Sequence, residues 1–288
     1  MEWRADAGDR EVRGLPDDLR ARDAGIEAFY DAYGAAREWG RFETPLGKVQ
    51  LAVITEFLRR WALPAGRVLD AGSGPGRFAL WLARQGARVT LLDISSVMLD
   101  AAREQFAAHG LAADGFLHES LFDVGRMEPR SFDLVLCLGG ALDYYPDEME
   151  AALRLMRRLL RPEGRLVGSV MSTVGALGMA LGTGWLPEPS ITGPELLEVY
   201  RTGLLTAKLS EHRAKMLSGQ ELRVLLGRCG LRTLELSATD CLLALPEAQL
   251  GSLRARPDIF AALLEAEFDA CRRSPDAGGH ILFAAAPA

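Results

Sequence analysis

The sequence predicts an α/β protein in which a mostly parallel β-sheet is covered by helices on both faces. The first observation is the stretch 67–93, where two short apolar runs flank a glycine-rich turn and an apolar helical segment. The second is that further apolar runs, at residues 116–121, 132–137 and 166–170, alternate with segments of helical period. Continuous apolar runs are typical of buried parallel strands, so this alternation indicates repeated βαβ units.

The turn between the first two predicted strands is the most informative part of the sequence. Asp70 stands at the end of the first strand, and Gly72, Gly74 and Gly76 follow it. These glycines let the backbone turn sharply and approach a ligand without a Cβ in the way. Asp93 stands at the end of the second strand, and ligands of such sheets bind outside the carboxyl ends of the strands. We therefore expect both acids to face one ligand.

The spacing of the glycines indicates which ligand this is. A dinucleotide fingerprint reads G-x-G-x-x-G, whereas this turn reads G-x-G-x-G and Arg77 takes the place of the last glycine. An acid just before the turn would repel a pyrophosphate, but it suits an ammonium group and a positive sulfur. Residues 70–76, Asp-Ala-Gly-Ser-Gly-Pro-Gly, resemble the first motif of class I S-adenosylmethionine-dependent methyltransferases. Another nucleotide-binding α/β fold is the alternative.

The resemblance implies a Rossmann-like, seven-stranded, mostly parallel sheet, closed by an antiparallel edge strand at residues 280–286. It also implies an N-terminal helical lid and an insertion after the fifth strand. The chain then divides into a lid at 1–45, an S-adenosylmethionine-binding core at 46–170, an acceptor-binding insertion at 171–216 and a C-terminal completion of the sheet at 217–288.

The resemblance further implies a set of contacts to the cofactor. A helix expected at residues 25–41 would bring Tyr30 or Tyr33 near the cofactor, and Arg41 would pair with its carboxylate; simple packing of that helix on the sheet is the alternative. Ile94 and Met98 would flank the adenine, as would residues next to Glu119. The expected cofactor-binding residues are Tyr30, Arg41, Asp70, Gly72, Gly74, Gly76, Asp93, Ile94, Met98, Ser120, Leu121 and Leu138.

The exit of the fourth strand, where class I methyltransferases bring the acceptor, supplies the catalytic candidates. Alignment of the reactants can remove about 7–11 kcal/mol of the barrier, and a base matters only where the acceptor loses a proton. Asp143 is the first candidate for that base and His212 the second, while Tyr144 would position the acceptor. The alternatives are turn capping for Asp143 and solvent exposure for His212. We expect no metal, because this loop lacks the acidic cluster of catechol-type enzymes.

Composition favours a small-molecule acceptor. The chain has 288 residues and a formal net charge of −6, which argues against a broad nucleic-acid footprint. The second reading is an RNA methyltransferase, since the chain also resembles bacterial enzymes that methylate carboxymethoxyuridine at the tRNA wobble position. That pattern would have Glu-Trp at Asp143 and Tyr144, and Arg157, Arg158 and Arg161 would have to form its phosphate patch. The third is a binding module without enzymatic activity.

Other sequence features bear on location and assembly. The four cysteines show no C-x-x-C spacing, and residues 1–22 are charged, look solvated and contain no apolar segment of a secretory signal. The uncharged run at residues 166–187 contains several Gly, Ser and Thr, and its first part completes an expected strand. We therefore expect a cytoplasmic protein without a membrane span. The oligomeric state stays open, and a homodimer is one option.

Overall fold

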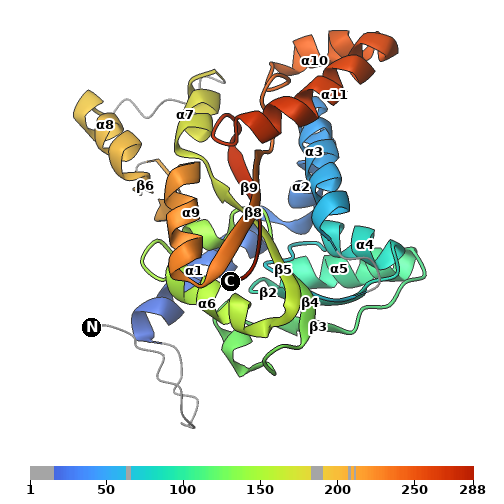
Figure 1. The fold of residues 1–288 in the computed structure, drawn as a ribbon, viewed down its shortest axis with the longest axis vertical. Helices are drawn as coiled ribbons and strands as arrows, with labels where there is room; N and C mark the ends of the chain where they lie inside the picture. The colour runs from blue at the N-terminus through green and yellow to red at the C-terminus, as the bar shows by residue number, and fades with distance from the viewer. Residues whose placement is uncertain (1–15, 63–65, 183–190, 207–208, 211) are drawn as a thin grey trace.

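The computed structural model describes residues 16–62, 66–182, 191–206, 209–210 and 212–288. Within these residues, the centre is a seven-stranded sheet of order β3-β2-β1-β4-β5-β9-β8 (Figure 1). Its strands are β1 Arg67–Ala71, β2 Arg88–Asp93, β3 Gly115–His118, β4 Phe132–Cys137, β5 Leu160–Met171, β8 Leu231–Ala238 and β9 His280–Pro287. Strands β1 to β5 pair in parallel, and β9 runs antiparallel to β5 and β8. The predicted Rossmann-like α/β fold is confirmed.

Two details of the predicted sheet are wrong. Strand β9, expected at the edge, lies between β5 and β8, and β8 is the strand at that end of the sheet. Its placement follows from two long-range ladders, such as Val170 with Ile281, which local patterns do not encode. The Arg-Pro-Glu-Gly-Arg sequence at residues 161–165 favours a turn before the fifth strand, but these residues belong to β5, whose pairing with β4 shifts register near Phe132.

Helices cover both faces of the sheet. The helices α1 Asp17–Tyr33, α6 Met149–Leu159 and α9 Gly219–Arg228 contribute to the core on one face. The helices α3 Pro45–Trp61, α4 Arg77–Arg84 and α5 Ser96–Ala108 contribute to the other, as Figure 1 shows. Alternate strand residues divide between the two cores: Leu69 faces the first, whereas Val68 faces the second. This alternation fixes the register of the strands and therefore the position of their ends.

The N-terminal helices differ from the expectation. Residues 17–22, expected to be solvated, form the first turns of α1, because Leu19 packs into the core with 5% of its surface exposed. The single helix expected at 25–41 is broken at Gly34, whose φ of +83° is unfavourable for other residues. A short helix, α2 Ala35–Gly40, then changes direction. This break turns the residues after α1 across the carboxyl ends of the strands.

Capping residues fix where several helices begin. Thr44 accepts a hydrogen bond from Gly47 N at 3.0 Å, so Thr44-Pro45 begins α3. Ser95 caps α5 by accepting from Met98 N at 3.2 Å. Ser218 and Glu221 form a capping box at the start of α9. These caps hold the turns that follow β2 and precede α9.

The insertion after β5 is only partly described. It contains α7 Thr173–Gly182, α8 Gly193–Thr202 and the antiparallel pair β6 Leu204–Leu205 and β7 Ala214–Lys215. Trp185 and the rest of 183–190 lie outside the described residues. The C-terminal part contains the helices α10 Glu247–Arg254 and α11 Pro257–Arg273. Among the helices that the structure describes, none has the length and apolar character to cross a membrane.

Candidate cofactor site

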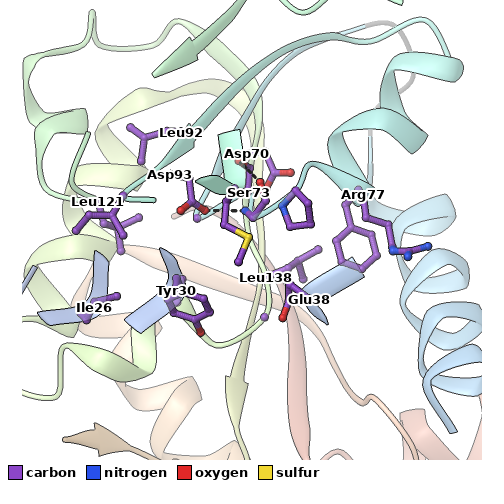
Figure 2. Close-up of a pocket in the computed structure, with 18 of the residues that line it drawn as sticks. Ile26, Tyr30, Glu38, Asp70, Ser73, Arg77, Leu92, Asp93, Leu121 and Leu138 are labelled. Atoms are coloured by element: carbon purple, nitrogen blue, oxygen red, sulfur yellow. Dashed lines mark hydrogen bonds between the residues drawn. The ribbon is translucent and has the colours of Figure 1, made fainter. Parts of the chain in front are cut away.

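A cavity lies at the carboxyl ends of β1, β2 and β4, beneath α1 and α2. Asp70 at the end of β1 and Asp93 at the end of β2 both line it (Figure 2). They meet there because β1 and β2 pair in register, with Asp70 opposite Leu91 and Ala71 opposite Leu92. The predicted site residues that line the cavity are Tyr30, Arg41, Asp70, Gly72, Gly74, Asp93, Ile94, Met98, Leu121, Leu138 and Tyr144.

The glycine turn forms the floor of this cavity and is held by β2. The backbone N–H groups of Gly72 and Ser73 donate to Leu92 O at 2.8 and 3.0 Å. Gly72, Gly74 and Gly76 have φ angles of +77°, +51° and +78°, which a residue with a Cβ adopts only with strain. A Cβ on Gly72 would also stand 2.8 Å from the Ala141 side chain. The turn therefore presents bare backbone to the cavity.

Asp93 is fixed by the backbone that it holds. Its Oδ2 accepts from Gly74 N at 2.6 Å, and its Oδ1 accepts from Ser95 N at 2.9 Å. Burial raises the pKa of this carboxyl, and the backbone donors oppose that shift because they favour the charged form. A carboxylate has about four lone-pair sites, so Asp93 still has capacity for ligand hydroxyl groups.

Asp70 is the less satisfied of the two acids. Its side chain is 2% exposed, and no described residue gives its Oδ2 a hydrogen bond. Burial, together with the nearby charge of Asp93, raises the pKa of the Asp70 carboxyl to about 7. A buried carboxyl oxygen without a donor is unfavourable, and a positively charged ligand group would relieve this.

The roof of the cavity comes from the N-terminal segment. Ile26 and Tyr30 reach it from α1, Glu38 from α2, and Arg41 and Phe42 from the turn that follows. Tyr30 was predicted, and Tyr33, the alternative, is not among the lining residues. Glu38 was missed by sequence reasoning. Its spacing of three residues from Arg41 on one helical face is the only local signal that could have found it.

Ile94, Met98 and Leu121 are among the apolar side chains that line the cavity. Ser120, predicted beside them, does not line it: its Oγ accepts from Phe122 N at 3.3 Å and its N–H donates to Asp123 at 3.1 Å.

Gly76 does not line the cavity either. A Cβ at that position would stand 2.9 Å from the Leu91 side chain and 3.0 Å from that of Ala102. Its place is therefore in the packing of α4 and α5 on β2, where only a residue without a side chain fits. Arg77, just after it, does line the cavity, but its Nη2 donates to Trp39 O at 2.6 Å.

The two catalytic candidates at the exit of β4 lie in different surroundings. Within the 3₁₀ turn Ala141–Tyr144, Tyr144 faces the cavity, whereas Asp143 is 0% exposed and is not among the lining residues. Asp143 Oδ2 accepts from Met171 N at 2.8 Å. Burial raises its pKa well above the usual range. These contacts make Asp143 a link between the β4 exit and β5, which corresponds to the turn-capping alternative.

Aromatic side chains connect the roof with the β4 exit. The hydroxyl groups of Tyr30 and Tyr144 lie 2.8 Å apart. Burial raises the pKa of both phenols, so both are neutral near pH 7. The ring of His212 contacts those of Tyr144 and Phe29, with centroids 5.5 and 4.9 Å apart, and His212 does not line the cavity. Tyr144 is therefore the one catalytic candidate in contact with the cavity among the described residues.

The three arginines considered for a phosphate patch are each bound within the chain. Arg157 donates to Gly230 O at 2.8 Å and Arg158 to Met127 O at 3.0 Å. Arg161 pairs with Asp133 at 2.7 Å. Arg157 and Arg158 join α6 to the loops at Gly230 and Met127, and Arg161 joins β5 to β4, so these side chains have a structural use.

Comparison with known proteins agrees with this geometry. Residues 68–164 match the family described as "Methyltransferase domain". The ubiquinone biosynthesis O-methyltransferase of Xanthomonas campestris pv. campestris (strain B100) is 35% identical over 123 residues, 42% of this chain and 50% of that protein. The match thus spans about half the length of that curated relative.

Solved structures extend the similarity to nearly the whole chain. One is Burkholderia thailandensis 1,6-didemethyltoxoflavin-N1-methyltransferase with bound 1,6-didemethyltoxoflavin and S-adenosylhomocysteine, with TM-score 0.56, 17% identity and coverage of 96% of this chain and 93% of that one. Another is magnesium protoporphyrin IX methyltransferase from Synechocystis PCC 6803 with bound S-adenosylhomocysteine, with TM-score 0.58, 17% identity and coverage of 93% and 100%. At this identity they show the fold.

The chain has the Rossmann-like fold that these solved structures share. Residues 68–164, which match the methyltransferase-domain family, contain the glycine turn and both acids of the cavity.

Proposed function

We propose that the protein is an S-adenosylmethionine-dependent methyltransferase acting on a small-molecule metabolite. The observation that carries this is the meeting of Asp70, the glycine turn and Asp93 around one cavity. The fit to the cofactor is supported by Asp70 Oδ2, a buried acceptor without a donor among the described residues. An ammonium group next to it would satisfy that acceptor, whereas a pyrophosphate would be repelled.

The residues that would hold the cofactor divide by chemistry. Asp93 would accept hydrogen bonds from the ribose hydroxyls, and Asp70 would face the ammonium group. Ile94, Met98 and Leu121 would enclose the adenine, since they are apolar lining residues that follow β2 and β3. Arg41 would bind the carboxylate, as the cationic side chain at the roof.

The cofactor supplies a methyl group on a sulfonium, which is already a good leaving group. The protein then has to exclude water and align the acceptor, and alignment can account for about 7–11 kcal/mol of the barrier. Tyr144 would position the acceptor through its hydroxyl group, which lies beside that of Tyr30. A general base is not assigned, because Asp143 is buried against Met171.

A small-molecule acceptor is favoured by three considerations. The net charge is −6, and the arginines of the conceivable phosphate patch are bound within the chain. The relative in Xanthomonas campestris is named as an O-methyltransferase of ubiquinone biosynthesis. We assign the segment 1–45 the part of a lid and the insertion 171–216 that of an acceptor-binding element. The tRNA reading has no observation in its favour beyond the shared motifs.

Calorimetry tests the cofactor assignment. The wild-type protein should bind S-adenosylmethionine and S-adenosylhomocysteine at micromolar concentration, and Gly74→Arg should abolish this binding. Gly86→Arg is the matched control, because Gly86 has a similar positive φ of +90° and open space around it. Tight binding of NAD with no binding of S-adenosylmethionine would refute the assignment.

The acceptor class is tested by methyl transfer from labelled cofactor. The proposal expects transfer to members of a panel of phenols, carboxylic acids and amines. Transfer confined to bulk tRNA, with a steep dependence on salt, would replace the small-molecule reading with the RNA reading.

A further inference from the structure

A charged pair on the N-terminal segment faces the cavity. Arg41 Nη2 lies 2.8 Å from Glu38 Oε1, and both residues line the cavity. The Glu38 side chain is only 17% exposed, and its Cγ is 3.9 Å from where a Cβ on Gly74 would stand. In Figure 2, Glu38 is drawn below Ser73 of the glycine turn, and Asp70 and Asp93 lie above it, near the ends of their strands. Glu38 is thus a third carboxylate of this cavity, and it comes from a different part of the chain.

The charges of the lining do not cancel. Its acidic side chains are Glu38, Asp70 and Asp93, and its basic ones are Arg41 and Arg77. Arg77 interacts with Trp39 O at 2.6 Å and with Glu43, a residue outside the lining, at 3.4 Å. The cavity itself therefore holds more negative than positive charge.

Among the described residues, no arginine of the cavity lining lies within ion-pair distance of Asp70 or Asp93. Asp93 is satisfied by backbone N–H groups, and Asp70 Oδ2 has no donor there. Burial and the charge of Asp93 raise the pKa of the Glu38 carboxyl, while Arg41 and Arg77 lower it. When ionised, Glu38 adds a further negative charge to the cavity lining. A cationic ligand lowers the energy of all three carboxylates at once.

We infer that Glu38 is a specificity-determining residue that favours the positively charged methyl donor over its neutral thioether product. This inference rests on the proposed function. The donor carries a sulfonium, an ammonium and a carboxylate, for a net charge of +1, whereas the product lacks the sulfonium charge. A carboxylate opposite Gly74 attracts the donor more strongly than the product, because only the donor carries the additional positive charge of the sulfonium. The same difference promotes release of the product.

The test compares the affinities of two ligands in Glu38→Gln by calorimetry. Affinity for S-adenosylmethionine should fall about tenfold, the effect of one partly screened charge, while affinity for S-adenosylhomocysteine should change less than about twofold. A mainly structural role of Glu38 would weaken both ligands equally, so an unchanged ratio of the two affinities would overturn the inference.

Two controls sharpen the comparison. Glu56→Gln makes the same chemical change outside the cavity lining, at a side chain whose partners Arg59 and Arg60 do not line it either, and it should leave both affinities unchanged. An analogue with an amine in place of the sulfonium should follow the donor, and its failure to lose affinity in Glu38→Gln would contradict a charge effect. If the wild-type protein binds neither ligand, the proposed function itself fails.

Discussion

The carboxylate of Asp93 accepts a hydrogen bond from the backbone N–H of Gly74 at 2.6 Å. This contact joins the end of β2 to the turn after β1, so one acid both shapes the turn and lines the cavity. Loss of the Asp93 side chain should therefore weaken cofactor binding in two ways. The geometry of the turn would relax, and the acceptor for the ribose hydroxyls would disappear.

Asp93→Ala should lower the affinity for S-adenosylhomocysteine at least about 100-fold, because hydrogen bonds to a charged group contribute about 1.5–3 kcal/mol each. Calorimetry measures this directly. Asp114→Ala is the control, since Asp114 pairs with Arg88 at the start of β2, outside the cavity lining. Equal losses in the two variants would contradict a specific role for Asp93.

Cofactor affinity should depend on pH through Asp70. Its pKa in the free protein is about 7, raised by burial and by Asp93, while its own charge raises the pKa of Cys137. A bound cation would lower the Asp70 pKa, so the free protein holds a proton below about pH 7 that binding must release. Affinity should thus be constant above about pH 7 and fall below it, by at most about tenfold per pH unit.

Calorimetry of S-adenosylmethionine between about pH 6 and pH 8 measures this slope. Asp70→Asn removes the titrating carboxyl. The part of the pH dependence of affinity that Asp70 contributes should then disappear. Asp93 and Glu38, whose pKa values are also raised, can add a residual slope of the same sign. Affinity that rises as the pH falls would contradict a carboxylate at Asp70 that binds the cofactor in its charged form.

Gly76 and Gly86 separate packing from backbone conformation. Both have positive φ, so Gly86→Ala should destabilise the protein by about 1–2 kcal/mol through the backbone alone. Gly76→Ala also brings a Cβ within 2.9 Å of Leu91, which should add about 1–3 kcal/mol. Urea unfolding measures both, and equal free energies of unfolding would show that the packing at Gly76 does not matter.

Asp143 should tolerate replacement by asparagine. An asparagine oxygen can still accept from Met171 N, so kcat should change less than about threefold, whereas removal of a general base would lower it about 10²–10⁴-fold. Asp143→Ala should instead lose about 1–3 kcal/mol of stability, because Met171 N is left unpaired. A loss of kcat of about 10²–10⁴-fold in Asp143→Asn, with cofactor affinity intact, would show that Asp143 is the general base.

Local patterns predicted the parts of the fold that are set locally. Strand β4 and the glycine turn follow from an apolar run and from residues that alone permit the required φ angles. The place of β9 between β5 and β8 depends on long-range pairing, and the roof depends on the break at Gly34. Neither is encoded within one helix or strand.

The site residues that could be predicted are likewise those whose positions follow from local patterns. Asp70 and Asp93 could be found because strand ends of a parallel sheet converge on one edge. For Glu38 the only local signal is its spacing from Arg41, because the direction of its side chain depends on how α2 folds over the turn. Asp143 and Tyr144 are neighbours in the sequence, but the 3₁₀ turn that begins after Gly140, at φ +81°, directs one to Met171 and the other to the cavity.

A crystal structure of the protein grown with S-adenosylhomocysteine tests the cofactor site most directly. We expect density for the ligand in the cavity, with the ribose hydroxyls on Asp93, the adenine between Ile94, Met98 and Leu121, and the amino-acid end toward Asp70. Density for the ligand at any other place, or adenine on the Asp70 side with the ribose away from Asp93, would contradict it.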